Sequence, residues 1–336
     1  MPTVSVDQPL VELPGAVGHA SLVLVDGTRA DRRLAAEVWY PAAGAASEPA
    51  VYDLFAGVSF TASATEEATA VAGPLPVVVF SHGRTGTRTS YVMLCEALAA
   101  HGYAVVAADH PGDRLEDWFA GAAVDDATNE AQRVDDIAHV LDAVASGRFD
   151  GLAPTLELDH GRVIVIGHSY GGWTAVVSAI EHAPAIRGAV GLQPFTRSVS
   201  RDDLARAAVP VLLVAAGADA TTPPALDSHP AFEVLGAPSV DLVVVAEAGH
   251  QACSDVGLYV ELLPEVDGLP ELVSDLVGGM AADVTGRAGD PWRPVVALHL
   301  ELVVAWADAV LVGADTAAAV DPFAGRPGVD VRSRRR

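Results

Sequence analysis

Lysine is absent from the 336-residue sequence, so all 20 basic residues are arginine, and they are opposed by 44 acidic residues. The formal charge of −24 disfavours non-specific binding to nucleic acid or to an anionic membrane. Cysteine occurs only at Cys95 and Cys253, which are too few for a disulfide framework. Both lie among small or apolar neighbours, so we expect buried free thiols.

Targeting and metal-binding patterns are also scarce. The N-terminus lacks a basic segment followed by an apolar one, so we expect no signal peptide. No run of 18 or more apolar residues occurs, so we expect no transmembrane helix and no integral membrane association. No cluster of histidine, cysteine and aspartate has the spacing of a metal site, so we expect neither metal nor organic cofactor. These expectations favour a cytoplasmic enzyme, and they leave its oligomeric state open.

Apolar runs and amphipathic stretches alternate along the chain. This alternation predicts the α/β class, with a mainly parallel sheet covered by helices on both faces. An antiparallel entry hairpin is expected first, from the strands 20–25 and 34–40. Later strands are expected at 75–80, 103–108, 163–166, 186–192, 209–216 and 240–246, and helices at 90–101, 129–146, from 173 and at 294–312. The loops that follow parallel strands meet at one edge of the sheet, where we look for chemistry.

The domain organisation expected is a single domain over residues 1–325. Residues 42–73 show little periodicity and are expected to form a surface insertion or a short helix over a pocket. Residues 257–290 are longer than a tight loop requires and are expected to form a lid or side wall. Residues 326–336 end in three arginines and are expected to be a disordered basic tail.

The clearest motif is Gly167-His168-Ser169-Tyr170-Gly171. It follows the apolar strand Val163–Ile166 and precedes an apolar helix, which is the strand, sharp turn and helix that a nucleophile elbow requires. Gly-x-Ser-x-Gly arises by chance in glycine-rich chains, but here both flanking elements are present. The pattern predicts Ser169 as a nucleophile.

A nucleophilic serine needs a base, and in this fold the histidine lies downstream of it. His250 follows the strand Val240–Ala246 through a short loop, which is the expected position. His299 lies inside the apolar terminal helix, and His229 has no strand leading to it. We therefore predict His250 as the base.

The acid that orients the histidine should follow a strand between the serine and the histidine. Asp219 follows the strand Val211–Ala216, and although Gly-Ala-Asp is also good turn chemistry, its position favours the acid. The competing slot, after the preceding strand, holds Gln193, which cannot carry a negative charge. Three further aspartates are less well placed: Asp202, Asp203 and Asp227.

The oxyanion hole is expected to use two backbone N–H groups. One is that of Tyr170, directly after the nucleophile, and the other that of Arg84, in the loop after the first strong central strand. Gly83 lets that loop turn toward a ligand, although a simple glycine-rich turn is the alternative. His82 and His168 are expected to brace their loops.

These residues resemble the α/β-hydrolase superfamily. More narrowly, they look like the platelet-activating-factor acetylhydrolase-like esterases and their bacterial relatives, including predicted dienelactone hydrolases and cutinase-like polyester hydrolases. The resemblance covers roughly residues 34–315 and is carried by the stretches 77–83, 98–110, 166–172 and 249–251, and by Asp255.

The resemblance implies a serine esterase that cleaves a small-molecule carboxylic ester through an acyl-enzyme. Gln193 departs from the acetylhydrolases, whose acid occupies that slot, so the acid is expected at Asp219, as in the polyester hydrolases. An apolar pocket lined by Phe195, Trp118, Phe119 and the segment 257–290 is expected, although these aromatic residues suit an ordinary core equally well. The alternatives are a polyester hydrolase, a thioesterase, a peptidase and a catalytically silent binding protein of the same fold.

Overall fold

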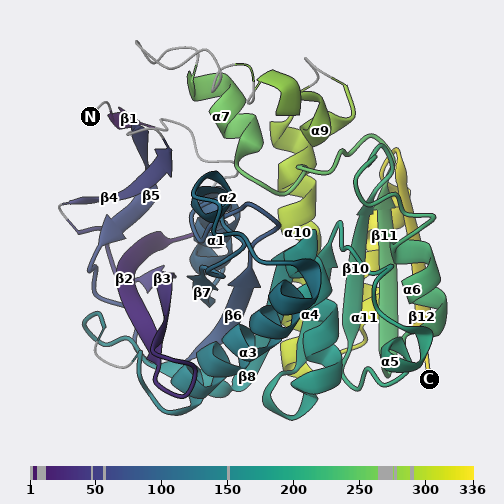
Figure 1. Cartoon of the computed structure of the whole chain (residues 1–336), viewed down its shortest axis with the longest axis horizontal. Coiled ribbons are helices and arrows are strands. Elements are labelled where there is room, and N and C mark those ends of the chain that lie inside the picture. The colour runs from purple at the N-terminus through teal and green to yellow at the C-terminus, as the bar shows by residue number, and fades with distance from the viewer. Residues whose placement is uncertain are drawn as a thin grey trace.

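The fold is known from a computed structural model that describes residues 3–5, 13–46, 48–55, 58–149, 152–263, 275, 278–287 and 291–336. These residues build one 12-stranded sheet (Figure 1). Across the sheet the strands are β1 (Thr3–Ser5), β5 (Val58–Glu66), β2 (Ala16–Asp26), β3 (Arg32–Ala42), β7 (Ala104–Ala108), β6 (Leu75–Ser81), β8 (Leu158–His168), β9 (Gly188–Leu192), β10 (Val211–Ala216), β11 (Ser239–Val245) and β12 (Val329–Arg335), with β4 (Pro49–Phe55) paired to β5.

The centre of the sheet is parallel from β7 through β6, β8, β9 and β10 to β11. These strands consist largely of valine, leucine, isoleucine and alanine because helices cover both of their faces. β2 and β3 form the expected antiparallel hairpin. The helices are α1 (Val92–Ala100), α2 (Leu115–Phe119), α3 (Asp126–Ala145), α4 (Tyr170–Glu181), α5 (Arg201–Leu204), α6 (Ser228–Val234), α7 (Val256–Leu262), α9 (Ala282–Thr285), α10 (Arg293–Val312) and α11 (Thr316–Val320).

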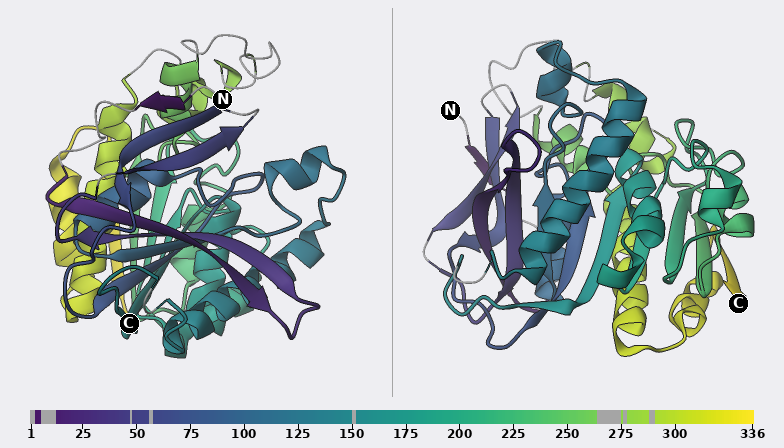
Figure 2. Two further views of the ribbon diagram at one scale, coloured as in Figure 1. Left: turned by 90° about the vertical axis from the view of Figure 1, so that its left-hand side faces the viewer. Right: turned by 60° about the horizontal axis from the view of Figure 1, so that its bottom comes forward.

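Two hydrophobic cores lie on opposite faces of the sheet, because successive strand residues point to opposite sides. Val78 and Phe80 of β6 join the core that contains α1 and α10. Val77 and Val79 join the core that contains α3 and α4. Figure 2 shows the helices distributed over the two sides of the sheet. The mainly parallel, doubly covered sheet predicted from the sequence is therefore confirmed.

α10 is the one described helix long and apolar enough to cross a membrane. In this structure it packs against α1 and β9. Trp306 is fully buried and its indole N–H donates to Asp241, at 2.9 Å. A ring atom of Trp306 lies 2.9 Å from where a Cβ on Gly188 would stand, so glycine lets helix and strand approach closely. Of the apolar window of α10, 39% is buried, so the core face accounts for part of the hydrophobicity of this helix.

The expectation for residues 42–73 is wrong in its architecture. This segment holds β4 and β5, which form an antiparallel hairpin that extends the sheet beyond β2. Val58, Phe60 and Ala64 are buried on one side of β5, while Ser63 of that strand is exposed. Small and polar residues obscure this period-two pattern in the sequence.

The expectation of a disordered tail at 326–336 is also wrong. Residues 329–335 form β12, which pairs antiparallel with β11 over its whole length. The basic side chains are neutralised locally, because Arg335 lies 3.0 Å from both Asp241 and Asp315. Ser333 adds a 2.7 Å hydrogen bond to Asp241. The tail is therefore an edge strand held by ion pairs.

Part of the segment 257–290 lies outside the described residues, so its role as a lid stays a prediction. Its described portions are most of α7 and α9 with their neighbours. The backbone carbonyls of Asp283 and Val284 in α9 accept hydrogen bonds from the N–H groups of Gln251 and Gly249, at 2.6 and 3.1 Å. α9 thus packs against the loop that carries His250.

Candidate active site

Ser169 stands at a strained turn between β8 and α4, with φ 55° and ψ −115°. The neighbouring glycines are required by close backbone approach. A Cβ on Gly167 would lie 2.1 Å from the carbonyl oxygen of Gly171, and one on Gly171 would lie 1.9 Å from that of Ser81. The motif predicted from the sequence therefore folds as a nucleophile elbow, which holds the serine hydroxyl at the sheet edge.

The structure brings the three predicted site residues into one hydrogen-bonded chain. The Ser169 hydroxyl lies 3.0 Å from Nε2 of His250. Nδ1 of the same imidazole lies 2.8 Å from Oδ2 of Asp219. The residues follow β8, β10 and β11, so they converge because parallel strands end at a common edge. All three side chains are buried, which keeps water away from these contacts.

The Asp219 carboxylate is fully paired. Its Oδ1 accepts the backbone N–H groups of Thr221 and Thr222, both at 2.8 Å. Its Oδ2 accepts the Thr222 hydroxyl at 2.7 Å and His250 at 2.8 Å. Burial by itself raises the pKa of Asp219, but the hydrogen bond and charge interaction with His250, aided by Thr222, lower that pKa to about 2. Asp219 is therefore a carboxylate at neutral pH.

The two predicted oxyanion donors lie beside the nucleophile, and their N–H groups have no acceptor among the described residues. Tyr170 begins α4, so its N–H has no acceptor within the helix. The N–H of Arg84 likewise donates to no described residue. A Cβ on Gly83 would lie 3.3 Å from Cβ of Ser169, so the Arg84 loop passes directly over the serine. Both N–H groups are thus available to a ligand oxygen.

The alternative position for the acid, after β9, holds the neutral side chain of Gln193, which contacts α10 instead of His250. Gln193 is buried, and its amide nitrogen lies 2.9 Å from Nε2 of His299. His299 is itself buried in α10, where Nδ1 contacts the carbonyl of Val295 at 2.7 Å. Asp227 accepts hydrogen bonds from Arg197 and not from His250. None of these residues competes with Asp219.

His168 joins the two loops on either side of the nucleophile. Its Nε2 lies 2.7 Å from the carbonyl oxygen of His250, and its Nδ1 lies 2.7 Å from the hydroxyl of Tyr91. The Tyr91 hydroxyl in turn accepts the N–H of Gly83, at 3.2 Å. Burial, followed by the nearby His250, lowers the pKa of His168 to about 3, so this imidazole stays neutral. The bracing function expected of His168 agrees with these contacts.

Asp255 connects the His250 loop to α1. Its carboxylate accepts the N–H groups of Val92 and Met93, at 2.6 and 3.2 Å, and so caps the helix from a distant part of the chain. Its own N–H donates to the carbonyl of Ser90. The base loop and the segment following the oxyanion loop are therefore held together.

Aromatic and cationic side chains stand next to the nucleophile. The rings of Tyr170 and Phe195 stack at 5.2 Å with an interplanar angle of 19°. The guanidinium of Arg84 lies 4.4 Å from the Tyr170 ring centre and 5.9 Å from that of Trp118. It is paired with Asp126 at 2.6 Å, so its charge is largely compensated. Trp118 and Phe119 are exposed, which argues against the ordinary-core alternative for that pair.

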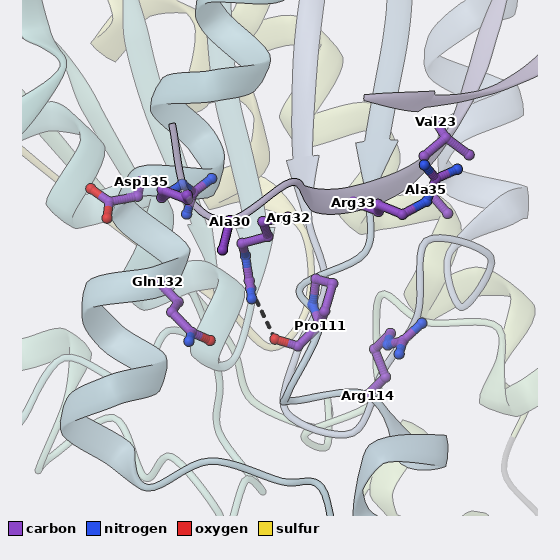
Figure 3. A pocket seen from close by; sticks show the side chains of 10 residues that line it. Val23, Ala30, Arg32, Arg33, Ala35, Pro111, Arg114, Gln132 and Asp135 are labelled. Carbon is purple, nitrogen blue, oxygen red and sulfur yellow. Dashed lines mark hydrogen bonds between the residues drawn. The ribbon is translucent and has the colours of Figure 1, made fainter. Parts of the chain in front are cut away.

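A hollow of about 680 Å³ lies elsewhere, between the β2–β3 turn and α3 (Figure 3). Arginines from β3, the turn and the loop after β7 face it, and no member of the Ser169 triad lines it. Carboxylates neutralise most of these cations: Arg32 binds Asp136 at 2.7 Å and Arg114 binds Asp117 at 2.8 Å. This hollow is therefore separate from the candidate active site.

Two residues that brace the loop 81–87 are not among those predicted from the sequence: Arg133 on α3, which contacts the loop carbonyls, and its partner Asp113. A signal for Arg133 exists in the sequence. The residue falls four positions before Ile137, in register with the apolar positions Val140 and Val144 of the same helix. A cation on the apolar stripe of a helix indicates a buried polar contact.

Comparisons with known proteins point to hydrolases. A family model described as serine aminopeptidase, S33, matches residues 72–202. Cutinase est1 of Thermobifida alba is 26% identical over 158 residues, 47% of this chain and 47% of that protein. Chloroplastic chlorophyllase-1 of Citrus unshiu is 28% identical over 122 residues, 36% of this chain and 33% of that protein. The chain thus spans about half the length of the cutinases it matches, and less of the chlorophyllase.

A solved structure matches nearly the whole chain. A ferulic acid esterase from Streptomyces cinnamoneus has a TM-score of 0.72 and 24% sequence identity, with 98% of this chain and 99% of that chain covered. The similarity establishes the α/β-hydrolase fold for this chain, as the sequence predicts.

Proposed function

We propose that the chain is a serine esterase that hydrolyses carboxylic esters through an acyl-enzyme, without metal or organic cofactor. The observation that carries the proposal is the continuous series of hydrogen bonds from Ser169 through His250 to Asp219, beside two backbone N–H groups that have no acceptor in the described part of the structure. This arrangement has the nucleophile, base, orienting acid and oxyanion donors that acyl transfer requires.

The first half of the reaction forms the acyl-enzyme. His250 Nε2 takes the hydroxyl proton of Ser169 as Oγ attacks the ester carbon, and the carbonyl oxygen becomes an oxyanion. The N–H groups of Arg84 and Tyr170 stabilise that charge. The intermediate collapses, the ester C–O bond breaks, and the leaving alcohol takes the proton from His250. Asp219 stabilises the imidazolium and keeps its Nδ1 protonated.

The second half uses water as the nucleophile. His250 removes a proton from water, and the hydroxyl attacks the acyl carbon attached to Ser169. Collapse of the second tetrahedral intermediate releases a carboxylic acid and returns the proton from His250 to the serine oxygen. The same two N–H groups, of Arg84 and Tyr170, serve both intermediates.

The proposed substrate is an ester with a small to medium acyl group, handled by an acetylhydrolase-like subtype of esterase. The stacked Tyr170 and Phe195 rings favour an apolar acyl group next to the serine. A polyester hydrolase is the second candidate. It is favoured by the similarity to cutinases and by Asp219 serving as the acid where Gln193 cannot. Turnover of esters of increasing acyl length, with and without a polyester film, separates the two.

The test of the activity itself is Ser169→Ala against Ser178→Ala. Ser178 lies on α4 and is buried, and its hydroxyl donates only to the carbonyl of Thr174, so it is a matched control. We expect Ser169→Ala to abolish p-nitrophenyl butyrate turnover and labelling by a fluorophosphonate probe, and Ser178→Ala to retain both. Turnover that persists in folded Ser169→Ala would refute the mechanism. A wild-type chain that neither turns over esters nor labels would indicate a silent binding protein.

Activity on thioesters and peptides is tested with the same pair of variants. The matched family model is described as an aminopeptidase, so an aminoacyl p-nitroanilide belongs in the screen beside a thioester and an ester. We expect a higher kcat/KM for the ester than for the anilide, because expulsion of an alkoxide needs less assistance from His250 than expulsion of an amine. A higher kcat/KM for the anilide would assign the site to peptides instead.

A further inference from the structure

Arg133 reaches from α3 to the underside of the oxyanion loop. It is fully buried and paired with Asp113, with 2.7 Å between Nη2 and Oδ2. Its Nη1 donates to the carbonyl oxygen of His82 at 2.9 Å and to the Ser81 hydroxyl at 3.2 Å. Its Nη2 also approaches the carbonyl oxygen of Gly83, at 3.4 Å. One guanidinium thus contacts two consecutive carbonyl groups of the loop.

His82 also contacts the carbonyl oxygen of Gly83. Its Nε2 accepts the backbone N–H of His110 at 3.0 Å, so the ring proton must sit on Nδ1. That Nδ1–H donates to the carbonyl oxygen of Gly83, at 2.7 Å. Burial, reinforced by Arg133, lowers the pKa of His82 well below its ordinary value, so the ring stays neutral and keeps this tautomer. The N–H of Gly86 adds a third contact to the same oxygen, at 3.1 Å.

The carbonyl of Gly83 and the N–H of Arg84 belong to one peptide group. A trans peptide is planar, so these two bonds point in opposite directions. Fixing the carbonyl oxygen toward Arg133 and His82 therefore turns the Arg84 N–H the opposite way, and no described residue accepts it. The adjoining peptide is fixed as well, because its oxygen binds Arg133 and its nitrogen, that of Gly83, donates to Tyr91.

We infer that Arg133 and His82 are positioning residues that aim the Arg84 N–H at the oxyanion of the ester reaction. The inference rests on the proposed function. Neither side chain touches the substrate; each acts through a loop carbonyl. An oxyanion donor contributes in proportion to how closely it points at the charge that develops, so a small rotation of this peptide lowers kcat. Ground-state binding is little affected, so KM changes less.

The test compares three variants with the unsubstituted chain. Arg133→Lys keeps a buried cation beside Asp113 but cannot form both carbonyl contacts, and Arg133→Gln removes the charge. Arg32→Lys is the matched control, because Arg32 also makes an ion pair with α3, through Asp136, and contacts no residue of the loop 81–87. The measurements are kcat and KM for p-nitrophenyl butyrate, and the inhibition constant of a trifluoromethyl ketone, which binds serine as a hemiketal oxyanion.

We expect Arg133→Lys to lower kcat by about tenfold or more with KM within about threefold, because misdirecting a donor forfeits part of the 10²–10³ lost when one is removed. The inhibition constant of the ketone should rise by the same factor as kcat/KM falls. Arg133→Gln should lose at least as much kcat as the lysine variant, and Arg32→Lys should match the unsubstituted chain. Parallel changes in kcat/KM and in the inhibition constant separate a positioning effect from a folding defect. A folding defect lowers the fraction of active protein but leaves the inhibition constant of the remaining active protein unchanged.

A folded Arg133→Lys with unchanged kcat and unchanged ketone inhibition overturns the inference. If neither Arg133 variant folds, the same measurements are made on His82→Leu. This variant removes the 2.7 Å hydrogen bond to the Gly83 carbonyl and leaves the Arg133–Asp113 ion pair intact. Different results would reject the proposed function itself: ester turnover that persists in Ser169→Ala, or no ester turnover by the unsubstituted chain. An active wild type, an inactive Ser169→Ala and unchanged Arg133 and His82 variants reject only the positioning role.

Discussion

Replacing Asp219 with asparagine tests whether this residue, distant from Ser169 in the sequence, is the acid that orients His250. The two N–H groups of Thr221 and Thr222 both point at Oδ1, so the amide oxygen of an asparagine takes that position. Its NH₂ group then faces Nδ1 of His250, which lies 2.8 Å from the present Oδ2. A donor there makes Nδ1 an acceptor and moves the ring proton to Nε2. The imidazole then presents N–H to Ser169 and cannot take the serine proton.

The magnitude follows from two losses. The negative charge that stabilises the imidazolium disappears; at about 4 Å and an effective dielectric constant of about 20, such an interaction is about 4 kcal/mol. At about 1.4 kcal/mol for each tenfold change, that corresponds to roughly 10³ in rate. The unfavourable tautomer adds to it, and the sum agrees with the roughly 10⁴ loss typical of this change in a serine triad. We therefore expect Asp219→Asn to lower kcat by about 10³ to 10⁴.

The assay is the steady-state hydrolysis of p-nitrophenyl butyrate, with thermal unfolding recorded for each variant. Asp202→Asn is the control: Asp202 is an exposed acidic residue that follows β9, and it should change kcat/KM by no more than about twofold. A kcat of folded Asp219→Asn within tenfold of that of the unsubstituted chain would contradict the role of Asp219 as the orienting acid. An equal loss in Asp202→Asn would place the acid elsewhere.

Three further outcomes follow from the same contacts. The free energy of unfolding in urea should be higher for Ser169→Gly than for Ser169→Ala, by about 1 kcal/mol, because glycine adopts the positive φ of the elbow without backbone strain and alanine does not. Removal of residues 326–336 should lower the free energy of unfolding by about 2 kcal/mol or more, because β11 loses its partner strand; an unchanged value would contradict the edge strand. The pKa of His168 falls from the ordinary 6.5 to about 3 through burial, so the unfolded chain binds its proton first as pH drops. The contribution of neutral His168 to the free energy of unfolding is complete above pH 6.5 and is lost as pH falls toward 3, by up to about 1.4 kcal/mol per pH unit. Urea titrations at several pH values should show a smaller loss per pH unit in His168→Asn.

Local patterns predicted most of the site because a nucleophile elbow is a local structure. Ser169 needs only its glycines, the strand before it and the helix after it, all within about a dozen neighbouring positions of the sequence. His250 and Asp219 are distant in sequence but follow strands whose order the fold prescribes. The two partners could therefore be found from strand ends alone, and the structure joins them at hydrogen-bond distances.

The errors concern strands at or near the sheet edges, where the sequence signal is weak. β12 reads Val-Asp-Val-Arg-Ser-Arg-Arg, with no fully buried residue among its described positions. Such a strand is stable only because β11 presents an unpaired edge and because Asp241 and Asp315 receive Arg335. Both conditions are properties of the assembled sheet. Residues 42–73 present the same difficulty, because β5 alternates small residues that carry little hydrophobic contrast.

Buried hydrogen bonds align the candidate active site, whereas the side chain of Trp118 near it is exposed. Gly83, Tyr91, His168 and the carbonyl of His250 form one hydrogen-bonded series that fixes the oxyanion loop relative to the base loop. None of these contacts involves Trp118, which is 46% exposed. Under the proposed function, we therefore expect substitution of Trp118 to change the preference for acyl groups without disturbing proton transfer, because removing an exposed side chain alters neither the strand ends nor the contacts that align the triad.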